Sequence, residues 1–488
     1  MTGAAALLLA PSVPLCGAVL VALCHRKPNL RDVVTIVTAC LMFAVTLSQT
    51  TMVLAGERPA AGPWTVVPGL ELSFVLEPLG MIFALVASAL WIVNSLYSIG
   101  YMRANREHRQ TSFYVLFAVA STATLGVAFA GNLFTLFLFY EILTFSTYPL
   151  VTHARSEEAL RAGRIYLLLL VGTSVVLFLS AIAWVHVAAG TTAFTPGGVI
   201  AGVMSPADAG LLLALFVFGI GKAAVMPVHR WLPAAMVAPT PVSALLHAVA
   251  VVKAGVFSIT KIAVYTLGIE NLASTGSGDW LIYVAGATVI LASLIAMAQD
   301  NLKRRLAYST ISQLSYVVLA VAILTPLSVI GAAMHIVAHA FGKITLFFAA
   351  GSIYTTAHKT EVSELDGIGW RMPWTMGAFA IGTLSMIGVP PTAGFISKWY
   401  IVGAAYAASN YFALAVIVLS TLLNAAYFAP IVYAAFFRAE RPVHHTRVNG
   451  DGPWPMTVAL VITAGATVLL FLAPQLPLTL ARDLMGHP

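Results

Sequence analysis

The sequence predicts an all-α polytopic membrane protein with about 14 transmembrane helices. Hydrophobic residues make up 60% of the 488 residues and charged residues only 9%, and the mean hydropathy is +0.92. A soluble domain carries about 25% charged residues. Apolar runs of the length that crosses a bilayer as a helix recur along the whole chain. The basic residues, moreover, alternate between successive loops, as they do in multi-pass proteins.

The expected spans follow one another with short hydrophilic connections. We take an apolar run of about 20 residues as one membrane-spanning helix. The approximate limits of the spans are then 4–24, 32–55, 74–98, 112–130, 132–151, 162–188, 209–229, 240–264, 280–299, 305–325, 327–351, 373–407, 411–437 and 456–477. The twelfth span is long and contains Pro390 and Pro391, so we expect two half-helices there. The apolar N-terminus has no basic start or clear cleavage site, so we expect a retained first helix and not a signal peptide.

The basic residues predict the orientation of the chain. They are concentrated in the odd-numbered loops, which contain Arg26, Lys27, Arg31, Arg103, Arg106, Arg109, Arg155, Arg161, Arg164, Lys303, Arg304, Arg305, Lys359, Arg371, Arg438, Arg441 and Arg447. Among the intervening loops, Arg58 is the main exception. Odd-numbered loops should therefore be cytoplasmic, with both termini on the outer side of the cell membrane.

Composition and motifs exclude several function classes. The net charge of +7 could indicate nucleic-acid binding, but the basic residues lie in short loops and no nucleic-acid-reading motif is present. Cys16, Cys24 and Cys40 form no CxxC pair, so no zinc or iron–sulfur site is expected. No glycine-rich phosphate loop and no Ser/His/Asp arrangement is visible. We therefore predict a conduit and not an enzyme, with no cofactor.

Ionisable residues within the expected spans are the candidate functional residues. Each central charge costs about 2.5–3.5 kcal/mol on insertion scales, so such residues face the interior, find partners or serve a function. We predict that eight of them transfer protons: Glu141, Lys222, His247, Lys253, His335, His339, Lys343 and Lys398.

Two of the lysines lie beside proline breaks. Lys222 is followed by Pro227, and Lys398 follows Pro390 and Pro391. A broken membrane helix is tolerated where it lines a cavity or is buried in protein. Two broken, charged segments at corresponding places indicate inverted repeats. We expect helices 1–3 in residues 1–110, a first five-helix repeat (helices 4–8) in 111–265, a second (helices 9–13) in 266–440, and helix 14 in 441–488.

The histidines and the remaining lysines have helical spacing. His247 and Lys253 are six residues apart, about 9 Å of helix rise, and are potential successive stations for a proton, although His247 alone is equally consistent with a core histidine. His335, His339 and Lys343 fall at i, i+4 and i+8 on one helical face. The histidine pair suits a metal, but no acidic or cysteine ligand accompanies it, so a proton relay is favoured.

Glu141 is the expected switch partner of Lys222. An ammonium paired with this carboxylate is stable in the membrane, whereas an unpaired one is costly and releases its proton, in this case toward Lys253. A structural carboxylate–lysine pair is the alternative.

Five segments resemble a known family: GNLFTLFLFYEILT, KAAVMPVHRWLPAAMVAPTPVSALLHAVAVVKAGVF, DNLKRRLAYSTISQLSY, HIVAHAFGKITLFFAAG and GVPPTAGFISKW. They are similar to the antiporter-like subunits of Mrp cation/proton antiporters, of respiratory complex I (subunits L, M and N) and of membrane-bound hydrogenases. Among these, the residues most resemble the D component of the multisubunit Mrp Na⁺/H⁺ antiporters. The resemblance implies 14 helices with inverted repeats and broken helices seven and twelve.

The resemblance also implies roles for individual residues. Glu141 and Lys222 would form the family's ion pair, Lys253 would be the central lysine of helix eight, and Lys398 the terminal lysine of helix twelve. His247, His335, His339 and Lys343 would connect the two half-channels along a hydrated axis.

The expected function is proton translocation in a multisubunit monovalent cation (Na⁺)/proton antiporter. The alternative is a proton-pumping subunit of a redox-driven complex, either complex I or a membrane-bound hydrogenase. A self-sufficient transporter of an organic solute is disfavoured, because nothing resembles a solute pocket. The expected partners are other membrane subunits, protons, Na⁺ and the lipid bilayer.

Overall fold

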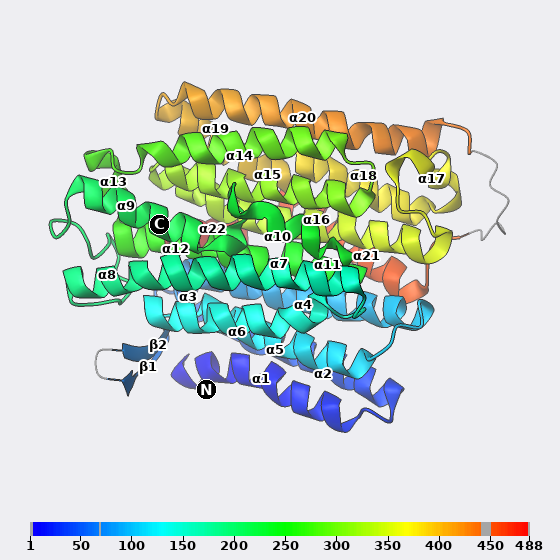
Figure 1. Ribbon diagram of the computed structural model, residues 1–488, viewed down its shortest axis with the longest axis horizontal. Helices are drawn as coiled ribbons and strands as arrows, with labels where there is room; N and C mark the ends of the chain where they lie inside the picture. Colours follow the sequence, from blue (N-terminus) through cyan, green and yellow to red (C-terminus); the bar gives the residue numbers. More distant parts are fainter. Residues whose placement is uncertain (1–2, 68–69, 441–449, 487–488) are drawn as a thin grey trace.

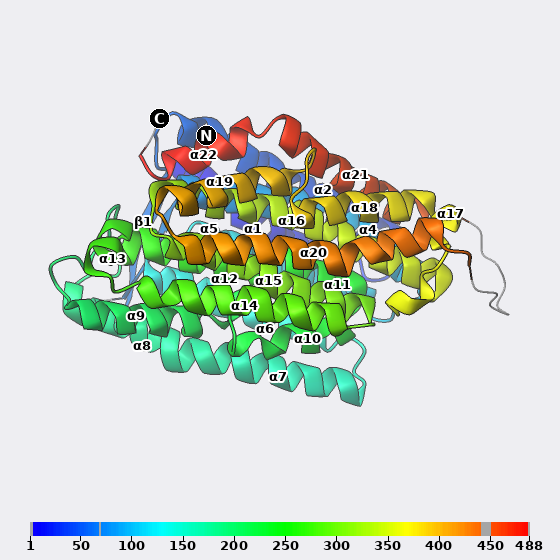
Figure 2. The ribbon, with the colours of Figure 1, turned by 90° about the horizontal axis from the view of Figure 1, so that it is seen from above.

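The computed structural model describes residues 3–67, 70–440 and 450–486 as an elongated bundle of roughly parallel helices (Figures 1 and 2). Arg441 and Arg447, which contribute to the expected charge of the thirteenth loop, lie outside the described residues. Figure 2 places α7 and α8 on one face of the bundle and α21 and α22 on the opposite face. The helices α12, α15 and α16 lie between these faces.

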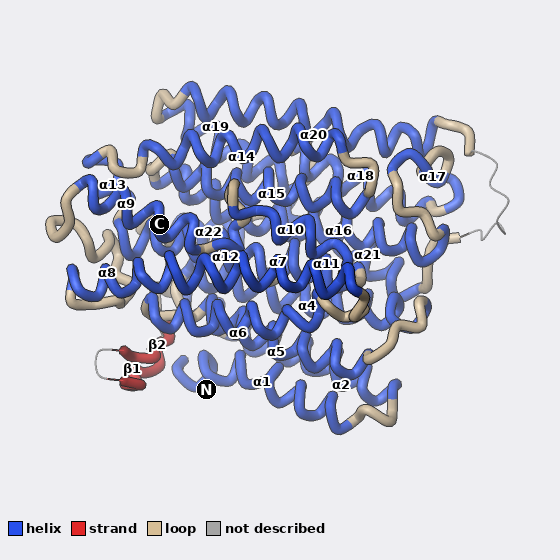
Figure 3. The backbone as a smooth tube through the Cα atoms, viewed as in Figure 1, coloured by secondary structure: helices blue, strands red, loops and turns tan. Residues whose placement is uncertain are grey.

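The N-terminal part contains three long helices and a hairpin. Its elements are α1 (Gly3–Leu23), α2 (Pro28–Ser48), α3 (Thr50–Leu54), β1 (Ala60–Val67), β2 (Leu70–Val75) and α4 (Pro78–Ala104). The strands pair antiparallel, and Trp64 packs edge-on against Phe74 with the ring centroids 6.3 Å apart. The sequence predicts only a short hydrophilic connection there, so the hairpin is an addition to the expected fold. It is the red element in Figure 3.

Residues 110–267 contain five helical segments, several of them interrupted. The first two are α5 (Gln110–Ala128) and α6 (Leu133–Val151), and the third is α7 (Glu157–Thr173), which continues through the π-turn η1 (Ser174–Phe178) into α8 (Leu179–Ala189). The fourth is α9 (Pro206–Gly219), followed by the short turns η2 (Gly221–Ala223), η3 (Val228–Arg230), α10 (Trp231–Ala234) and η4 (Ala235–Val237). The fifth is α11 (Thr240–Ala244), which continues through η5 (Leu245–Val249) and α12 (Val251–Ile262) to η6 (Ala263–Leu267).

The rest of the chain is also helical. Its elements are α13 (Ile269–Thr275), α14 (Asp279–Ala298), α15 (Leu302–Ala322), α16 (Pro326–Ala357), η7 (Val362–Glu364), α17 (Ile368–Arg371), α18 (Pro373–Ile387), α19 (Ala393–Ala407), α20 (Tyr411–Phe437), α21 (Trp454–Leu472) and α22 (Gln475–Asp483).

Eleven of the described helices are long and apolar enough to cross a membrane. The protein is therefore an α-helical multi-pass membrane protein. The expected spans outside these eleven are the seventh, the tenth and the twelfth. The seventh and twelfth are divided into short pieces, and α15, the tenth, begins with Lys303, Arg304 and Arg305 and carries several serines. The number fourteen thus stays a prediction.

The same local motif occurs near the start of α6 and near the start of α15. Asn132 and Asn301 cap these helices, and the next residue in each case donates a backbone hydrogen bond of 2.9 Å, Leu133 to Thr192 and Leu302 to Thr360. The two motifs are at opposite ends of the bundle, because α6 starts beside the hairpin and α15 starts near α17 (Figure 1). This pairing supports the expected inverted repeats.

The two ends of the bundle differ in charge. We call the end with the α1–α2, α4–α5, α6–α7 and α14–α15 connections, where Arg26, Arg106, Arg109 and Arg155 lie, the arginine-rich end; it lies on the right in Figure 1. The opposite end, with the strands and α13, is the hairpin end. Helix α1 begins and helix α22 ends toward the hairpin end, as the expected even number of spans requires.

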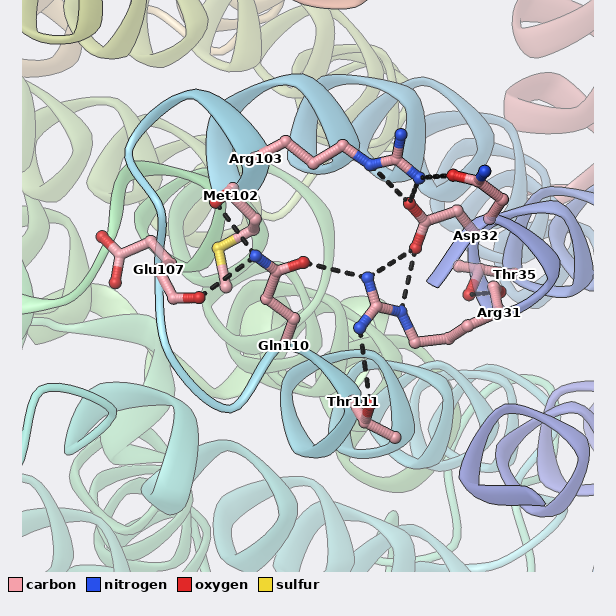
Figure 4. A network of polar contacts seen from close by, with 9 residues as sticks. Arg31, Asp32, Thr35, Met102, Arg103, Glu107, Gln110 and Thr111 are labelled. Carbon is pink, nitrogen blue, oxygen red and sulfur yellow. Dashed lines mark hydrogen bonds and ion pairs between the residues drawn. The ribbon is translucent and has the colours of Figure 1, made fainter. Parts of the chain in front are cut away.

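A buried charge network joins the N-terminal helices at the arginine-rich end (Figure 4). The carboxylate of Asp32 accepts from Arg31 at 2.8 Å and from Arg103 on α4 at 2.5 Å. Arg31 also donates to Gln110 at the start of α5 at 2.9 Å. Arg31 and Asp32 are 4% and 5% exposed, whereas the side chain of Arg103 is 46% exposed. The network therefore attaches α2 to α4 and α5 through a buried pair and one arginine that reaches the solvent.

Candidate functional site

The predicted proton-transfer residues lie in the most enclosed part of the bundle. Of the eight, seven are buried and Glu141 is half-buried. The segment from α11 to η6 and the helix α16 supply five of them, and these two elements are surrounded by protein along almost their whole length. Charged groups in such a place need partners, because burial of an unpaired charge is costly.

Lys222 lies in the interruption of the seventh segment. α9 ends at Gly219, the single turn η2 follows, and Ala224 then takes a left-handed backbone conformation with φ of +55° before Pro227. The backbone comes very close to α12 here. A Cβ atom on Gly255 would lie 2.2 Å from the Ala223 nitrogen, so only glycine admits this approach.

The ammonium of Lys222 is held by α6. Its Nζ donates to the Tyr140 carbonyl oxygen at 2.7 Å and to the Thr144 hydroxyl at 2.6 Å, and it lies 3.1 Å from the centre of the Tyr140 ring. Neither carboxylate oxygen of Glu141 has a hydrogen-bond partner among the described residues. Glu141 still attracts the Lys222 charge electrostatically. The structure therefore shows these two residues as neighbours, with the lysine bonded to the residues around Glu141 in place of its carboxylate.

Lys253 and His339 connect α12 to α16. The Lys253 Nζ lies 2.5 Å from the His339 Nδ1, which makes this a direct hydrogen bond between two groups that both exchange protons. His247, one π-turn earlier, packs its ring on Phe347 at 4.7 Å. Neither of its ring nitrogens has a partner among the described residues. A π-turn of this kind often marks a functional site.

His335 continues the path from α16 toward α19. Its Nδ1 lies 2.9 Å from the Ser397 hydroxyl, and its ring centroid lies 6.2 Å from that of His339. The ring of Tyr316 is stacked on His335 with the centroids 5.5 Å apart, and the Lys398 Nζ lies 4.9 Å from that same tyrosine ring. Tyr316 therefore contacts both His335 and Lys398 and connects the histidines of α16 to that lysine.

Lys398 caps the second helix interruption. α18 ends at Ile387, and the lysine donates to the carbonyl oxygens of Met386 at 3.1 Å and Ile387 at 2.8 Å. The last carbonyl groups of a helix have no partner within the helix, and a cation there is favourable. Pro390 and Pro391 separate α18 from α19 and so leave these carbonyl groups free for the lysine.

Lys343 connects α16 to α15. Its Nζ donates to the Ser309 hydroxyl on α15 at 2.8 Å, and that hydroxyl also accepts from Tyr427 at 3.0 Å. The structure thus links Lys253 to His339 by a hydrogen bond and places His339 next to His335, whereas Lys343 and Lys222 form their hydrogen bonds with other residues. Within residues 3–67, 70–440 and 450–486, no group of three or more His, Cys, Asp or Glu side chains could hold a metal ion.

Sequence reasoning missed one buried ion pair. Lys261, at the end of α12, lies 2.7 Å from Glu77, the residue before α4. Lys261 also donates to the Ala130 carbonyl oxygen at 2.7 Å. Lys261 falls inside the expected span 240–264, so its charge in an apolar run was the signal that could have revealed it.

Comparisons with known proteins agree with this architecture. The family model for NADH:quinone oxidoreductase/Mrp antiporter transmembrane proteins matches residues 130–424. NADH-quinone oxidoreductase subunit N of Desulforudis audaxviator (strain MP104C) is 32% identical over 450 residues, which are 88% of this chain and 87% of that protein. Hydrogenase-4 component B of Escherichia coli (strain K12) is 31% identical over 431 residues, 83% of this chain but 62% of the longer relative.

Solved structures share the fold. A chain of the Mrp complex from Dietzia sp. DQ12-45-1b superposes with a TM-score of 0.85 at 22% identity, covering 100% of this chain and 97% of that one. A chain of the membrane-bound sulfane sulfur reductase, an archaeal respiratory membrane complex, also gives 0.85 at 24% identity, covering 99% and 98%. By the family match over residues 130–424 and the identity to subunit N, this chain belongs to the NADH:quinone oxidoreductase/Mrp antiporter transmembrane family.

Proposed function

We propose that this chain translocates protons as one membrane subunit of a larger complex. The observation that carries the proposal is the 2.5 Å contact between Lys253 and His339. It joins α12, which packs on the helix interruption at Lys222, to α16, which packs on α19 beside the interruption at Pro390 and Pro391. Lysine and histidine nitrogens both bind and release protons, and buried ionisable residues in membrane helices are characteristic of proton relays.

The histidines of the axis support a hydrated path. Nε2 of His335, Nε2 of His339 and both nitrogens of His247 have no hydrogen-bond partner among the described residues. Buried polar groups are as a rule satisfied by protein or by ordered water. Water molecules between these nitrogens would complete a chain along which protons hop.

Glu141 and Lys222 would control access to this path. The lysine is bonded to Tyr140 and Thr144 in the structure. Movement of its ammonium from these partners to the Glu141 carboxylate would form the ion pair and stabilise the ammonium, and the reverse movement would favour proton release toward Lys253. The roles of these residues are predictions that mutagenesis must test.

Two sources of driving force are candidates for the complex. The first is exchange against Na⁺, as expected from the sequence and compatible with the fold shared with the Mrp complex. The second is electron transfer in partner subunits. The relatives named NADH-quinone oxidoreductase subunit N and hydrogenase-4 component B favour the second, because sequence identity above 30% over most of the chain carries more weight than a shared fold. Location in the cell membrane and the outward orientation of both termini also remain predictions.

The test is to purify the chain with its native partner subunits and to reconstitute the complex in sealed vesicles. Proton movement is then followed with a pH-sensitive dye after addition of Na⁺, of NADH or of hydrogen. Proton movement driven by NADH or hydrogen and independent of Na⁺ would identify the redox-driven complex; a Na⁺-dependent signal without a reductant would identify the antiporter. No proton movement under any of these conditions would overturn the proposal.

Lys253→Arg tests the path itself. Arginine keeps the positive charge but does not deprotonate in proteins. We expect the complex to assemble and its proton translocation to fall on the order of 100-fold, the low end of what a positioned proton-transfer group contributes. Lys27→Arg, in the exposed α1–α2 connection, is the matched control and should translocate normally.

A further inference from the structure

A second buried ion pair lies away from the axis, at the hairpin end of the molecule. The Lys261 Nζ lies 2.7 Å from the Glu77 Oε1 and donates to the Ala130 carbonyl oxygen at 2.7 Å. Glu77 is 7% exposed and Lys261 is fully buried. Tyr265 also interacts electrostatically with Glu77, so the carboxylate has a second polar neighbour in addition to Lys261.

Both members of this pair line a cavity of about 450 Å³. Arg58, Glu270 and Asp483 also line it, and Arg58 and Glu270 are exposed to solvent. Carboxylates outnumber basic groups among these lining residues, so the cavity attracts cations, including protons. The pair is therefore enclosed by protein on one side and adjoins a solvent-connected space on the other, whose lining includes charged side chains.

Lys261 also lies on the same helix as Lys253. Eight residues separate them, which is about 12 Å of rise along α12. Ser258 lies between them, buried and three residues before Lys261, where its side chain is on the same side of the helix. Its hydroxyl donates to the Ala254 carbonyl oxygen and keeps its lone pairs available to accept a proton donor.

We propose that Glu77 and Lys261 form a proton exit from the first half of the path to the hairpin end of the membrane. This inference rests on the proposed proton translocation. Within the ion pair, an N–H bond of the Lys261 ammonium breaks as an O–H bond forms on Glu77. The neutral carboxylic acid releases this proton to water in the cavity, which leaves a neutral Lys261 amine beside the Glu77 carboxylate. A proton passed from the Lys253 ammonium through Ser258 and water then binds the Lys261 amine and restores the ion pair.

The rival explanation is that the pair only attaches the start of α4 to the end of α12. The two explanations differ in what Lys261→Arg does. Arginine keeps the charge and the ion pair, so an attachment would survive, whereas a proton exit would be blocked because arginine does not deprotonate. The expected result is normal assembly with proton translocation lower on the order of 100-fold.

The experiment uses the complex purified with its native partners and reconstituted in sealed vesicles, with proton movement followed by a pH-sensitive dye. Lys253→Arg is measured in parallel. If Lys253→Arg blocks translocation and Lys261→Arg does not, the exit is refuted and the proposed function stands. If both variants translocate normally, the proposed path fails as well.

A second variant keeps the test decisive if Lys261→Arg does not assemble. The double substitution Glu77→Gln with Lys261→Met removes both charges together and so leaves no unpaired buried charge. It should assemble and show the same loss of translocation. Translocation at the wild-type rate in this double variant would overturn the exit.

Discussion

Gly255→Ala tests whether the close approach of α12 to the first helix interruption is needed. The added Cβ would lie 2.2 Å from the Ala223 nitrogen and 2.4 Å from the Lys222 carbonyl carbon. Both are backbone atoms and cannot rotate away, so the two segments must separate by about 1 Å to reach ordinary contact distance. Overpacking of this kind costs about 1–3 kcal/mol.

The displacement also moves Lys222 relative to Tyr140 and Thr144. A misplacement of about 1 Å at a reacting group can lower a rate on the order of 100-fold. We therefore expect the purified complex to unfold at a lower temperature in detergent and to translocate protons far more slowly in vesicles. Gly465→Ala is the matched control, because it lies mid-helix in α21 with nothing within 4 Å of the added Cβ. Gly465→Ala should leave the free energy of unfolding unchanged or raise it by at most about 1 kcal/mol. Equal behaviour of the two variants would refute the argument from packing.

Three further predictions concern stability. Asp32→Ala should destabilise the complex by about 3–5 kcal/mol in detergent unfolding, because it leaves the buried Arg31 without its carboxylate partner. Thr144→Val should cost about 2 kcal/mol by the same measurement, since it removes a hydrogen bond to the Lys222 ammonium. Glu107→Gln should raise the unfolding temperature at pH 8 but leave it unchanged at pH values below 4.5, the ordinary pKa of glutamate. The reason is that burial raises the pKa of Glu107.

The direction of the pKa shift at Glu107 sets the sign of this effect. A raised pKa means that the fold favours the protonated carboxyl group, so its contribution to stability is present at low pH and is lost as the pH rises through the raised value. At pH 8 the wild type carries the cost of a partly buried charge and glutamine does not. A constant difference between the two proteins from pH 4 to pH 8 would contradict this reasoning. For Asp32 and Thr144, unchanged unfolding midpoints would show that water or other groups replace the lost partners.

The spans were predictable because bilayer-length apolar runs leave a strong signal in sequence. The hairpin of β1 and β2 was not predicted, because two short strands between helices resemble an ordinary polar connection. The interruptions were expected from Pro227, Pro390 and Pro391, since proline removes a helix hydrogen bond. What the prolines could not reveal is the single-turn geometry of η2, which depends on Gly255 of a different helix.

The candidate site was predictable in its membership but not in its contacts. A charge in an apolar run is visible without a structure, and the eight predicted proton-transfer residues are all buried or half-buried in the bundle. The hydrogen-bond partners could not be predicted, because the possible partners on the facing helix lie within about one helical turn of each other. Lys222 bonds to Tyr140 and Thr144, on either side of Glu141, and no spacing rule distinguishes these three positions across two helices. Lys261 escaped notice because a lysine near the end of a span ordinarily extends to the membrane surface.

The short contact between Lys253 and His339 also limits how much charge the axis can carry. At 2.5 Å, two positive charges would repel by about 7 kcal/mol even at an effective dielectric constant of 20. The hydrogen bond requires one donor and one acceptor, so the two bases hold at most one excess proton. A second proton can arrive only after the first has moved on. On the proposed path, protons would therefore pass this pair one at a time, because each must leave before the next can bind.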